Sequence, residues 1–344
     1  MEKSVKIPIN KITDHGFREP AIDETHYGLG ALKELKGFPE VILKPDGQYD
    51  NLPPREVQNR AMEPMNCTNY GTYNCLDIIE MTLYGTMTDK SERYGGVISG
   101  TTKGGNDPHT VAEHIRDEGM IPEEVLPYND TINTWNKYYS PKPMTQKYLD
   151  MGDDWLDKYD FGHEWVWTNK ALAIKSKQDL MMKWIKNSPL GVSVLAWQYR
   201  NGYYWKNRGE QDNHWCCCYG YVKDKYWKIY DSYDDTTKEL EWNYDFSFCK
   251  RYYLNKKKQE TNMEKTKLSQ IYNELLMREP DELADGYLSH EEEFCRAEVG
   301  KSEERQQIIR LVEWARAWNV FNLLGLVDLF GICSKLKGFI KSED

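Results

Sequence analysis

A cysteine, a histidine and an aspartate stand in an order and local setting that suit nucleophilic chemistry. Cys67 lies in the run 64–70, where a loop gives way to an expected helix. His214 opens an aromatic and cysteine-rich run that is typical of a buried strand, and Asp231 lies at the end of the next expected strand. A thiol is a weak nucleophile until a base takes its proton and a helix N-terminus favours the thiolate. The three residues therefore predict a nucleophile, its base and the group that orients the base.

Other residues of the same types have to be weighed against this set. Asp234 and Asp235 follow closely in the chain and stay open as alternatives for the orienting group. Cys75 lies about two helical turns after the nucleophile and is expected in the core. The adjacent cysteines 216–218 are expected to pack as small apolar side chains in a strand. Three histidines are expected to be surface or loop residues without partners: His109, His114 and His163.

Hydrophobic periodicity predicts helices in the first part of the chain. The helix that starts at Cys67 carries apolar residues at helical spacing and should end at Gly85. An Asp-Pro pair at 107–108 predicts the start of a second helix, which Gly119 should stop. A third helix is predicted over 177–187.

The second part of the chain is richer in strand patterns. Residues 129–170 are aromatic and charged without a clean period, and we expect them to be loop-like. Short apolar and β-branched runs after them predict strands at 190–195, 215–222, 225–231 and 247–253. Helices followed by strands are typical of the α+β class, so this is the expected fold class.

Length, composition and charge narrow the classes of function. The chain has 344 residues, of which 40% are hydrophobic and 13% aromatic, enough for a folded main domain and a smaller one. Its net charge of −10 argues against nucleic acid as a partner, because phosphates require a basic surface. The short basic run at 256–258 is better explained as a solvated linker.

The cysteines and the N-terminus bear on compartment and metal binding. Three of the eight cysteines are adjacent and cannot all form bridges, which favours a reduced chain. No pair of cysteines has the CxxC spacing of common zinc sites, so neither a metal nor a cofactor is predicted. Residues 1–10 lack the apolar stretch of a secretory signal, and we expect a cytoplasmic or virion-associated protein.

Segments around these residues, taken in order, resemble the papain-like cysteine peptidases over roughly residues 50–255. A cysteine opens a helix, and a glycine-rich loop with Gly104 and Gly105 follows it. Asn213 precedes the histidine, and Asp231 stands where that family has an asparagine before Ser-Trp. The matching segments of the chain are 67–70, 103–106, 118–122, 126–128, 188–194, 213–221 and 231–233.

The resemblance implies a fold and a set of roles. The fold would have a helical subdomain with Cys67 and a β-rich subdomain with His214 and Asp231. Cys67 would attack a peptide carbonyl, His214 would serve as base and acid, and Asp231 would fix the imidazole tautomer. The cleft between the subdomains would hold a protein or peptide substrate against Gly104, Gly105 and Asn213.

Departures from the family pattern concern the loop before the cysteine. Family members carry a glutamine six residues before the cysteine that donates to the oxyanion, and this chain has Ala61 there. Gln58 lies nine residues before and is our candidate oxyanion donor, with an insertion in the loop; Arg60 is the weaker one. Pro64 stands where secreted relatives commonly have a disulfide cysteine.

The composition changes after the expected peptidase domain. We predict an N-terminal extension at 1–50, the peptidase domain at 51–254, a polar linker at 255–267 and an all-helical appendage at 268–344. Part of the appendage resembles DUF4214, a small helical domain of unknown function found in bacterial surface and phage-encoded proteins. Its apolar tail helix is too interrupted to span a bilayer, so packing on a domain or a second subunit is expected, with interfacial membrane contact as the alternative.

The sequence leaves three functions open. The first is a cysteine peptidase that works through an acyl-thioester. The second is a catalytically weak or inactive structural protein, for example of a phage particle, assembled through the C-terminal helices. The third is a peptidoglycan amidohydrolase, although those domains have a much shorter interval between cysteine and histidine.

Overall fold

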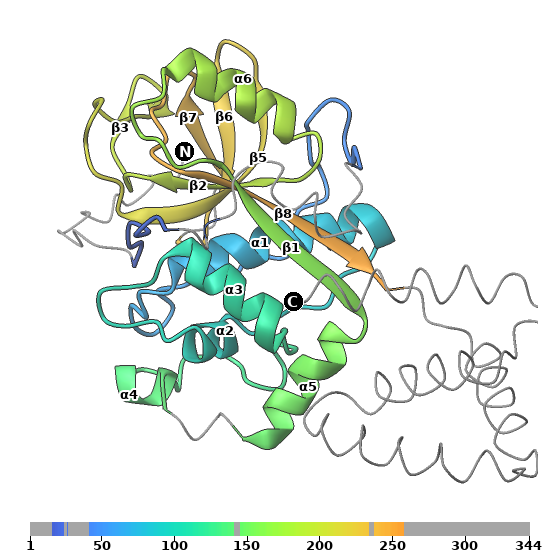
Figure 1. Ribbon diagram of the computed structural model, residues 1–344. Coiled ribbons are helices and arrows are strands. Elements are labelled where there is room, and N and C mark those ends of the chain that lie inside the picture. The colour runs from blue at the N-terminus through green and yellow to red at the C-terminus, as the bar shows by residue number, and fades with distance from the viewer. Residues whose placement is uncertain (1–15, 24–25, 27–40, 141–144, 234–236, 258–344) are drawn as a thin grey trace, which may run out of the picture. The chain divides into compact units, whose positions relative to one another are not determined.

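The computed structural model describes residues 16–23, 26, 41–140, 145–233 and 237–257 (Figure 1). All of them belong to one unit that ends at Lys258. The predicted appendage at 268–344, with its resemblance to DUF4214 and its assembly role, lies outside the described residues. So do most of the linker and the two alternative aspartates, Asp234 and Asp235.

In the described residues, five helices precede all of the strands: α1 (Cys67–Tyr84), α2 (Glu92–Ile98), α3 (Pro108–Glu118), α4 (Trp135–Tyr138) and α5 (Gln146–Leu156). The predicted ends of α1 and α3 are confirmed. Gly85 ends α1 in the left-handed region at φ 71°, where a glycine pays no steric cost. Asp107 caps α3 by accepting hydrogen bonds from the backbone N–H groups of His109 and Thr110.

The strands form one mixed sheet with the order β1-β8-β2-β5-β6-β7-β4-β3. Neighbouring strands are antiparallel except for β4 and β7. The helix α6 (Ile174–Trp184) lies between β1 and β2 in the chain. The strands are β1 (Tyr159–Trp167), β2 (Leu190–Val194), β3 (Tyr199–Arg200), β4 (Tyr203–Tyr204), β5 (His214–Val222), β6 (Tyr226–Tyr230), β7 (Lys238–Glu241) and β8 (Cys249–Lys256).

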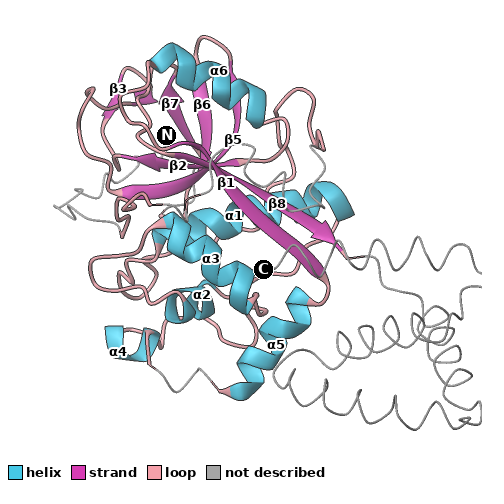
Figure 2. Ribbon diagram, viewed as in Figure 1, coloured by secondary structure: helices cyan, strands magenta, loops and turns pink. Residues whose placement is uncertain are grey.

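Helices and strands are largely separated in space, as Figures 1 and 2 show. Helices α1 to α5 gather on one side of the unit, while α6 lies on the opposite side of the strands. Helix α1 packs directly on β5: a Cβ atom at Gly71 would come within 2.8 Å of the Trp215 carbonyl oxygen. This close approach brings the first turn of α1, which begins at Cys67, against the strand that begins at His214.

The segregated α+β pattern and the four predicted strands are confirmed, but the loop-like prediction for 129–170 is wrong. This segment contains α4, α5 and β1. Helix α5 buries only Gly152 and Trp155, so its apolar stripe is too thin to be read from sequence. Strand β1 is buried on both faces from Phe161 onward, which removes the alternation expected of a half-exposed strand. The predicted helix at 177–187 is α6 and starts three residues earlier.

The described cysteines are all buried. Cys75 and the run 216–218 pack in the main apolar core, as predicted. Burial raises the pKa of the Cys75 thiol, which keeps it protonated and unreactive at neutral pH.

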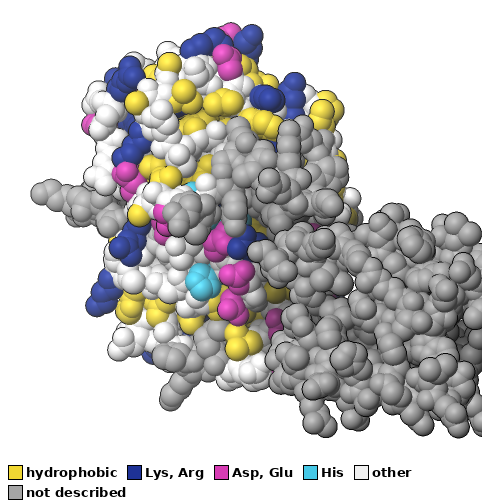
Figure 3. Space-filling view, viewed as in Figure 1, with side chains coloured by type: hydrophobic (Ala, Val, Ile, Leu, Met, Phe, Trp, Pro, Cys, Tyr) yellow, Lys and Arg dark blue, Asp and Glu magenta, His cyan; other side chains and the backbone are white. Residues whose placement is uncertain are grey.

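The surface of the described part carries both signs of charge. The face in Figure 3 shows lysine and arginine side chains mixed with acidic and apolar ones. Among the described residues, no helix is long and apolar enough to cross a membrane.

Candidate active site

His214 and Asp231 form a buried pair at the ends of adjacent strands. The Nε2 atom of His214 lies 2.7 Å from Oδ1 of Asp231, and both side chains are fully buried. Strand β5 begins at His214, and Asp231 directly follows β6, which pairs with β5. A carboxylate on Nε2 orients the ring and leaves Nδ1 as the nitrogen that can act as a base.

A lysine that the sequence reasoning missed holds the other oxygen of Asp231. The Nζ atom of Lys238 lies 2.7 Å from Oδ2 of Asp231, and both groups are buried. Burial alone would disfavour the carboxylate, but Lys238 and His214 hold the pKa of Asp231 well below its usual value. Asp231 is therefore a carboxylate that is fixed from two sides. A lysine at the start of β7 belongs to no motif, so only the fold could reveal it.

Cys67 opens α1 and is completely buried. It belongs to an apolar cluster with Phe17, Trp165, Trp215 and Phe248. The preceding residue, Asn66, does not cap the helix with its side chain; its amide donates to the Glu92 carbonyl at 2.8 Å instead. The N-terminal end of a helix favours a thiolate at this position because its backbone N–H groups carry partial positive charge.

Glu63 and Tyr233 connect the loop before Cys67 to the histidine. The Tyr233 hydroxyl donates to Oε2 of Glu63, and its ring lies edge-on to His214 with centroids 5.1 Å apart. Burial, Glu63 and the nearby Cys67 together raise the pKa of Tyr233, which keeps it a hydrogen-bond donor. Oε1 of Glu63 accepts from the backbone N–H of Met65 at 2.7 Å. Neither Glu63 nor the role of Tyr233 was predicted from the sequence.

The structure separates the two candidates for the oxyanion donor. Gln58 is buried beside the aspartate strand, where its backbone N–H donates to the Ser232 carbonyl at 2.7 Å. Its side-chain amide donates to Oε1 of Glu63 at 2.7 Å. Arg60, by contrast, has a half-exposed side chain that contacts the Tyr128 carbonyl at 3.2 Å. Gln58 therefore lies against Ser232 and Glu63, whereas Arg60 lies against Tyr128.

The glycine loop is covered by the N-terminal segment. Asn106 donates from its backbone to the Gly16 carbonyl at 2.9 Å, and Phe17 pairs with Asn106 as a parallel bridge. A Cβ atom at Gly105 would lie 1.9 Å from the Gly16 carbonyl oxygen, so only glycine allows this approach. Gly104 is exposed and makes no comparably close contact.

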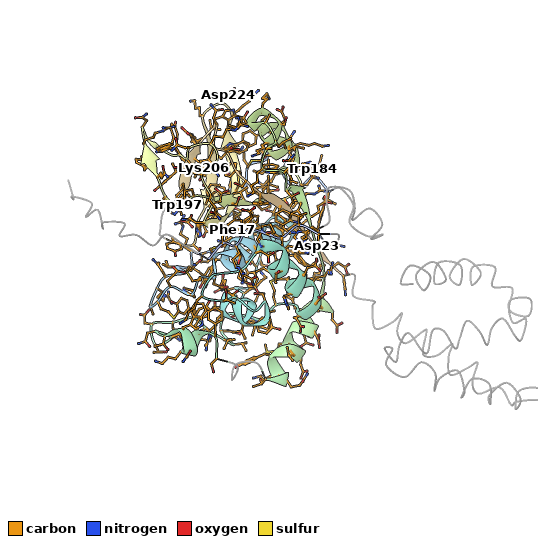
Figure 4. The ribbon with its side chains drawn as sticks, turned by 60° about the vertical axis from the view of Figure 1, so that its left-hand side comes forward. Phe17, Asp23, Trp184, Trp197, Lys206 and Asp224 are labelled. Atoms are coloured by element: carbon orange, nitrogen blue, oxygen red, sulfur yellow. The ribbon has the colours of Figure 1, made fainter. Side chains whose placement is uncertain are left out.

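Phe17 belongs to the apolar cluster that contains Cys67. Its ring stacks on Trp215, the residue after His214, with centroids 5.8 Å apart and planes 7° from parallel. Figure 4 shows Phe17 at the level where the strands meet helix α1. The segment that the sequence suggested to be an irregular extension thus covers the candidate site, and the isolated Phe17 gave no signal of this.

A cavity opens beside Phe17. It has a volume of about 270 Å³, and its lining includes Phe248 and the buried ion pair of Lys206 and Asp212. The third predicted cleft residue, Asn213, accepts a hydrogen bond from the Ala196 backbone N–H at 2.9 Å. Phe17 and Phe248, which line this cavity, also belong to the apolar cluster that contains Cys67.

The predictions for two histidines are wrong. His109 is buried on α3, and His163 is buried in β1, with Glu113 close to both. Burial lowers the pKa of His109 to about 3 and the pKa of His163 well below its usual value, so both rings are neutral at pH 7. His114, the third histidine of that prediction, is half-buried. Helical spacing alone did not show which side of α3 faces β1.

The comparisons with known proteins give no assignment of family. No family model matches the chain, and no curated protein matches it. Among solved structures, it is similar to the proform of the Amb a 11 cysteine protease of ragweed pollen, with 16% identity, a TM-score of 0.43, and coverage of 65% of this chain and 73% of that one. Xylellain, a cysteine protease from Xylella fastidiosa, has 14% identity and a TM-score of 0.48, with coverage of 71% of this chain and 96% of that one. Likenesses at these TM-scores are too loose to assign an activity.

Proposed function

We propose that the chain is a papain-like cysteine peptidase with Cys67 as nucleophile, His214 as base and Asp231 as the group that orients His214. The observation that carries this proposal is the buried 2.7 Å contact between His214 and Asp231. It lies at the start of the strand on which the Cys67 helix packs, with Gly71 at the point of closest approach.

The proposed reaction has two halves. His214 takes the thiol proton of Cys67, and the sulfur attacks the carbonyl carbon of the peptide to form a carbon–sulfur bond. When the tetrahedral species collapses, the carbon–nitrogen bond breaks and the imidazolium gives its proton to the leaving amine. His214 then removes a proton from water as the water oxygen attacks the thioester carbon. The carbon–sulfur bond breaks, the carboxylic acid product leaves, and the imidazolium returns its proton to the Cys67 sulfur.

Negative charge on the carbonyl oxygen requires preplaced donors. The backbone N–H of Cys67 and the side-chain amide of Gln58 are our candidates. Glu63 fixes the orientation of that amide by accepting a hydrogen bond from it at 2.7 Å. Because Glu63 also holds the Met65 backbone, the loop before Cys67 and the amide are positioned by the same carboxylate.

The substrate class follows from the same arrangement. Residues 16–18 pair by backbone hydrogen bonds with Asn106 beside the glycine loop, and this pairing supports the binding of an extended chain there. We infer that a protein or peptide substrate binds there when this segment is displaced. The fully buried Cys67 also favours a second candidate, a structural protein whose triad does not act.

The test is covalent labelling of the reduced, full-length protein. Wild type, Cys67→Ala, His214→Ala and the buried-thiol control Cys75→Ala are treated with a peptide vinyl sulfone, and intact mass is recorded. A single adduct that is lost in the Cys67 and His214 variants and kept in Cys75→Ala supports a working thiolate–imidazole pair. If Phe17→Ala protein, in which the cover is weakened, also gives no adduct, the peptidase proposal fails and the structural role remains.

A further inference from the structure

His109, Glu113 and His163 bring three metal-ligand side chains together at a place that the proposed peptidase does not use. His109 and Glu113 lie one turn apart on α3, and His163 lies on β1, the strand that packs against this helix. One potential ligand atom of each residue lies within 4.8 Å of the others. Glu113 Oε1 is 2.9 Å from His163 Nε2 and 4.0 Å from His109 Nε2.

The short contact between His163 and Glu113 is not a hydrogen bond. Within the part of the chain that the structure describes, neither His163 Nε2 nor Glu113 Oε1 has a hydrogen-bond partner, although His163 is only 1% exposed. Buried polar atoms without partners are costly, and native proteins rarely keep them. Two such atoms 2.9 Å apart are placed as two ligands of one ion would be.

The chemistry of the three groups selects the class of ion. Two imidazole nitrogens and one carboxylate oxygen suit Zn²⁺ and its neighbours in the first transition row, whereas Mg²⁺ and Ca²⁺ prefer oxygen ligands alone. His26 stacks on His109 with ring centroids 3.8 Å apart, and it accepts a hydrogen bond from Trp165 Nε1 at 3.0 Å. These contacts fix the orientation of the His109 ring from the side of the N-terminal segment.

Two cations lie near the cluster. Arg116 pairs with Oε2 of Glu113 and leaves Oε1 to face the histidines. Lys250 is buried with its Nζ atom 4.1 Å from the centre of the Trp165 ring. Burial lowers the pKa of Lys250 to about 7.

We propose that His109, Glu113 and His163 bind a divalent transition-metal ion, with Zn²⁺ as the leading candidate. The ion would join helix α3 to strand β1 and so link the helical part of the unit to its sheet. Three protein ligands leave one position of a tetrahedral ion for water. The proposal does not depend on peptidase activity, because none of the three residues belongs to the proposed triad.

The test is titration of the reduced, tag-free full-length protein with Co²⁺ followed by absorption, and with Zn²⁺ followed by calorimetry. We expect one Co²⁺ per chain with a visible spectrum that lacks the intense band of thiolate ligation. His163→Ala and Glu113→Gln should weaken binding by more than about tenfold, whereas His114→Ala, on the same helix, should leave it unchanged. Zn²⁺ should raise the melting temperature of wild type but not of the two ligand variants.

Three results would overturn the proposal. The first is absence of Co²⁺ binding to wild type, and the second is a spectrum with thiolate bands, which would assign the ion to cysteines. The third is equal binding by wild type and Glu113→Gln. Glu113→Gln keeps the size of the side chain on a partly exposed helix position, so it remains informative if His163→Ala does not fold.

Discussion

At the scale of single residues, the candidate site combines an expected pair with an unexpected cation. His214 and Asp231 were predicted from their strands, whereas Lys238 was not. A carboxylate that is buried between a lysine and a histidine is stable as an anion only while both partners remain. Lys238 therefore positions Asp231, which in turn orients His214, without itself facing the proposed reaction.

This arrangement predicts the effect of removing the lysine. Lys238→Met should lower the free energy of unfolding by about 3 kcal/mol, because it removes the lysine that neutralises a buried carboxylate. The double variant Lys238→Met with Asp231→Asn should recover much of this loss, since the neutral amide needs no cation. Urea unfolding at pH 7 measures the free energy of unfolding of each variant. The labelling rate of Cys67 should likewise be lower in the single variant than in the double variant. Equal destabilisation of the single and double variants would contradict the role of the ion pair.

Another residue-scale prediction concerns Glu123, which lies outside the site. Burial and the neighbouring Glu56 raise the pKa of Glu123 to about 8. A carboxyl whose pKa is raised in the folded state binds its proton more tightly there than in the unfolded chain. Its stabilising contribution is therefore complete below the ordinary pKa of about 4.3 and is lost as the pH rises to about 8.

Glu123→Gln should consequently stabilise the protein relative to wild type more at pH 8 than at pH 5. Melting temperatures of the two proteins at both pH values give this difference directly. Glu124→Gln is the matched control, because Glu124 is exposed. If the difference in melting temperature between Glu123→Gln and wild type is the same at pH 5 and pH 8, the pKa of Glu123 is not raised in the folded protein.

At the scale of elements, the N-terminal segment and helix α1 decide access to Cys67. The backbone of residues 16–18 follows the glycine loop, and Phe17 fills the apolar space between Cys67, Trp215 and Phe248. Helix α1 packs on β5, with Gly71 against Trp215. The thiol is thus enclosed by elements that are distant in sequence.

Phe17→Ala should increase the rate at which a small alkylating agent labels Cys67. The ring contributes roughly 2 kcal/mol of apolar burial, so its loss should raise the open population about tenfold or more. Ile22→Ala is the control on the same segment, because Ile22 is 50% exposed. The labelling rate of each variant is measured by intact mass. Equal rates in the two variants would show that Phe17 does not cover the thiol.

At the scale of the whole molecule, the described unit is a helical part and a sheet, which meet where α1 packs on β5 and where α3 packs on β1. The candidate triad lies where α1 meets β5, and the proposed metal site lies where α3 meets β1. Both sites therefore need the two parts to be packed together. Removal of bound Zn²⁺ by a chelator should accordingly lower the melting temperature of wild type and leave His163→Ala unchanged.

The sequence by itself determined those helices and strands whose formation depends on residues close together in the chain. The caps at Asp107 and Gly85, the apolar spacing of α1 and the apolar strands β2, β5 and β6 all follow from neighbouring residues, and the structure confirms them. The candidates Cys67, His214 and Asp231 were also named from local setting and order. Local rules suffice there because a helix end or a buried strand is decided within a few residues.

Only the tertiary structure decided which distant groups meet. Lys238 against Asp231, Glu63 against Gln58, Phe17 over Cys67, and His163 against Glu113 all join segments that no periodic pattern connects. Strand β1 was missed for the same reason, because burial on both faces depends on what packs against it. Such contacts are selected by the packing and charge balance of the whole unit, and a pattern in one segment does not contain that information.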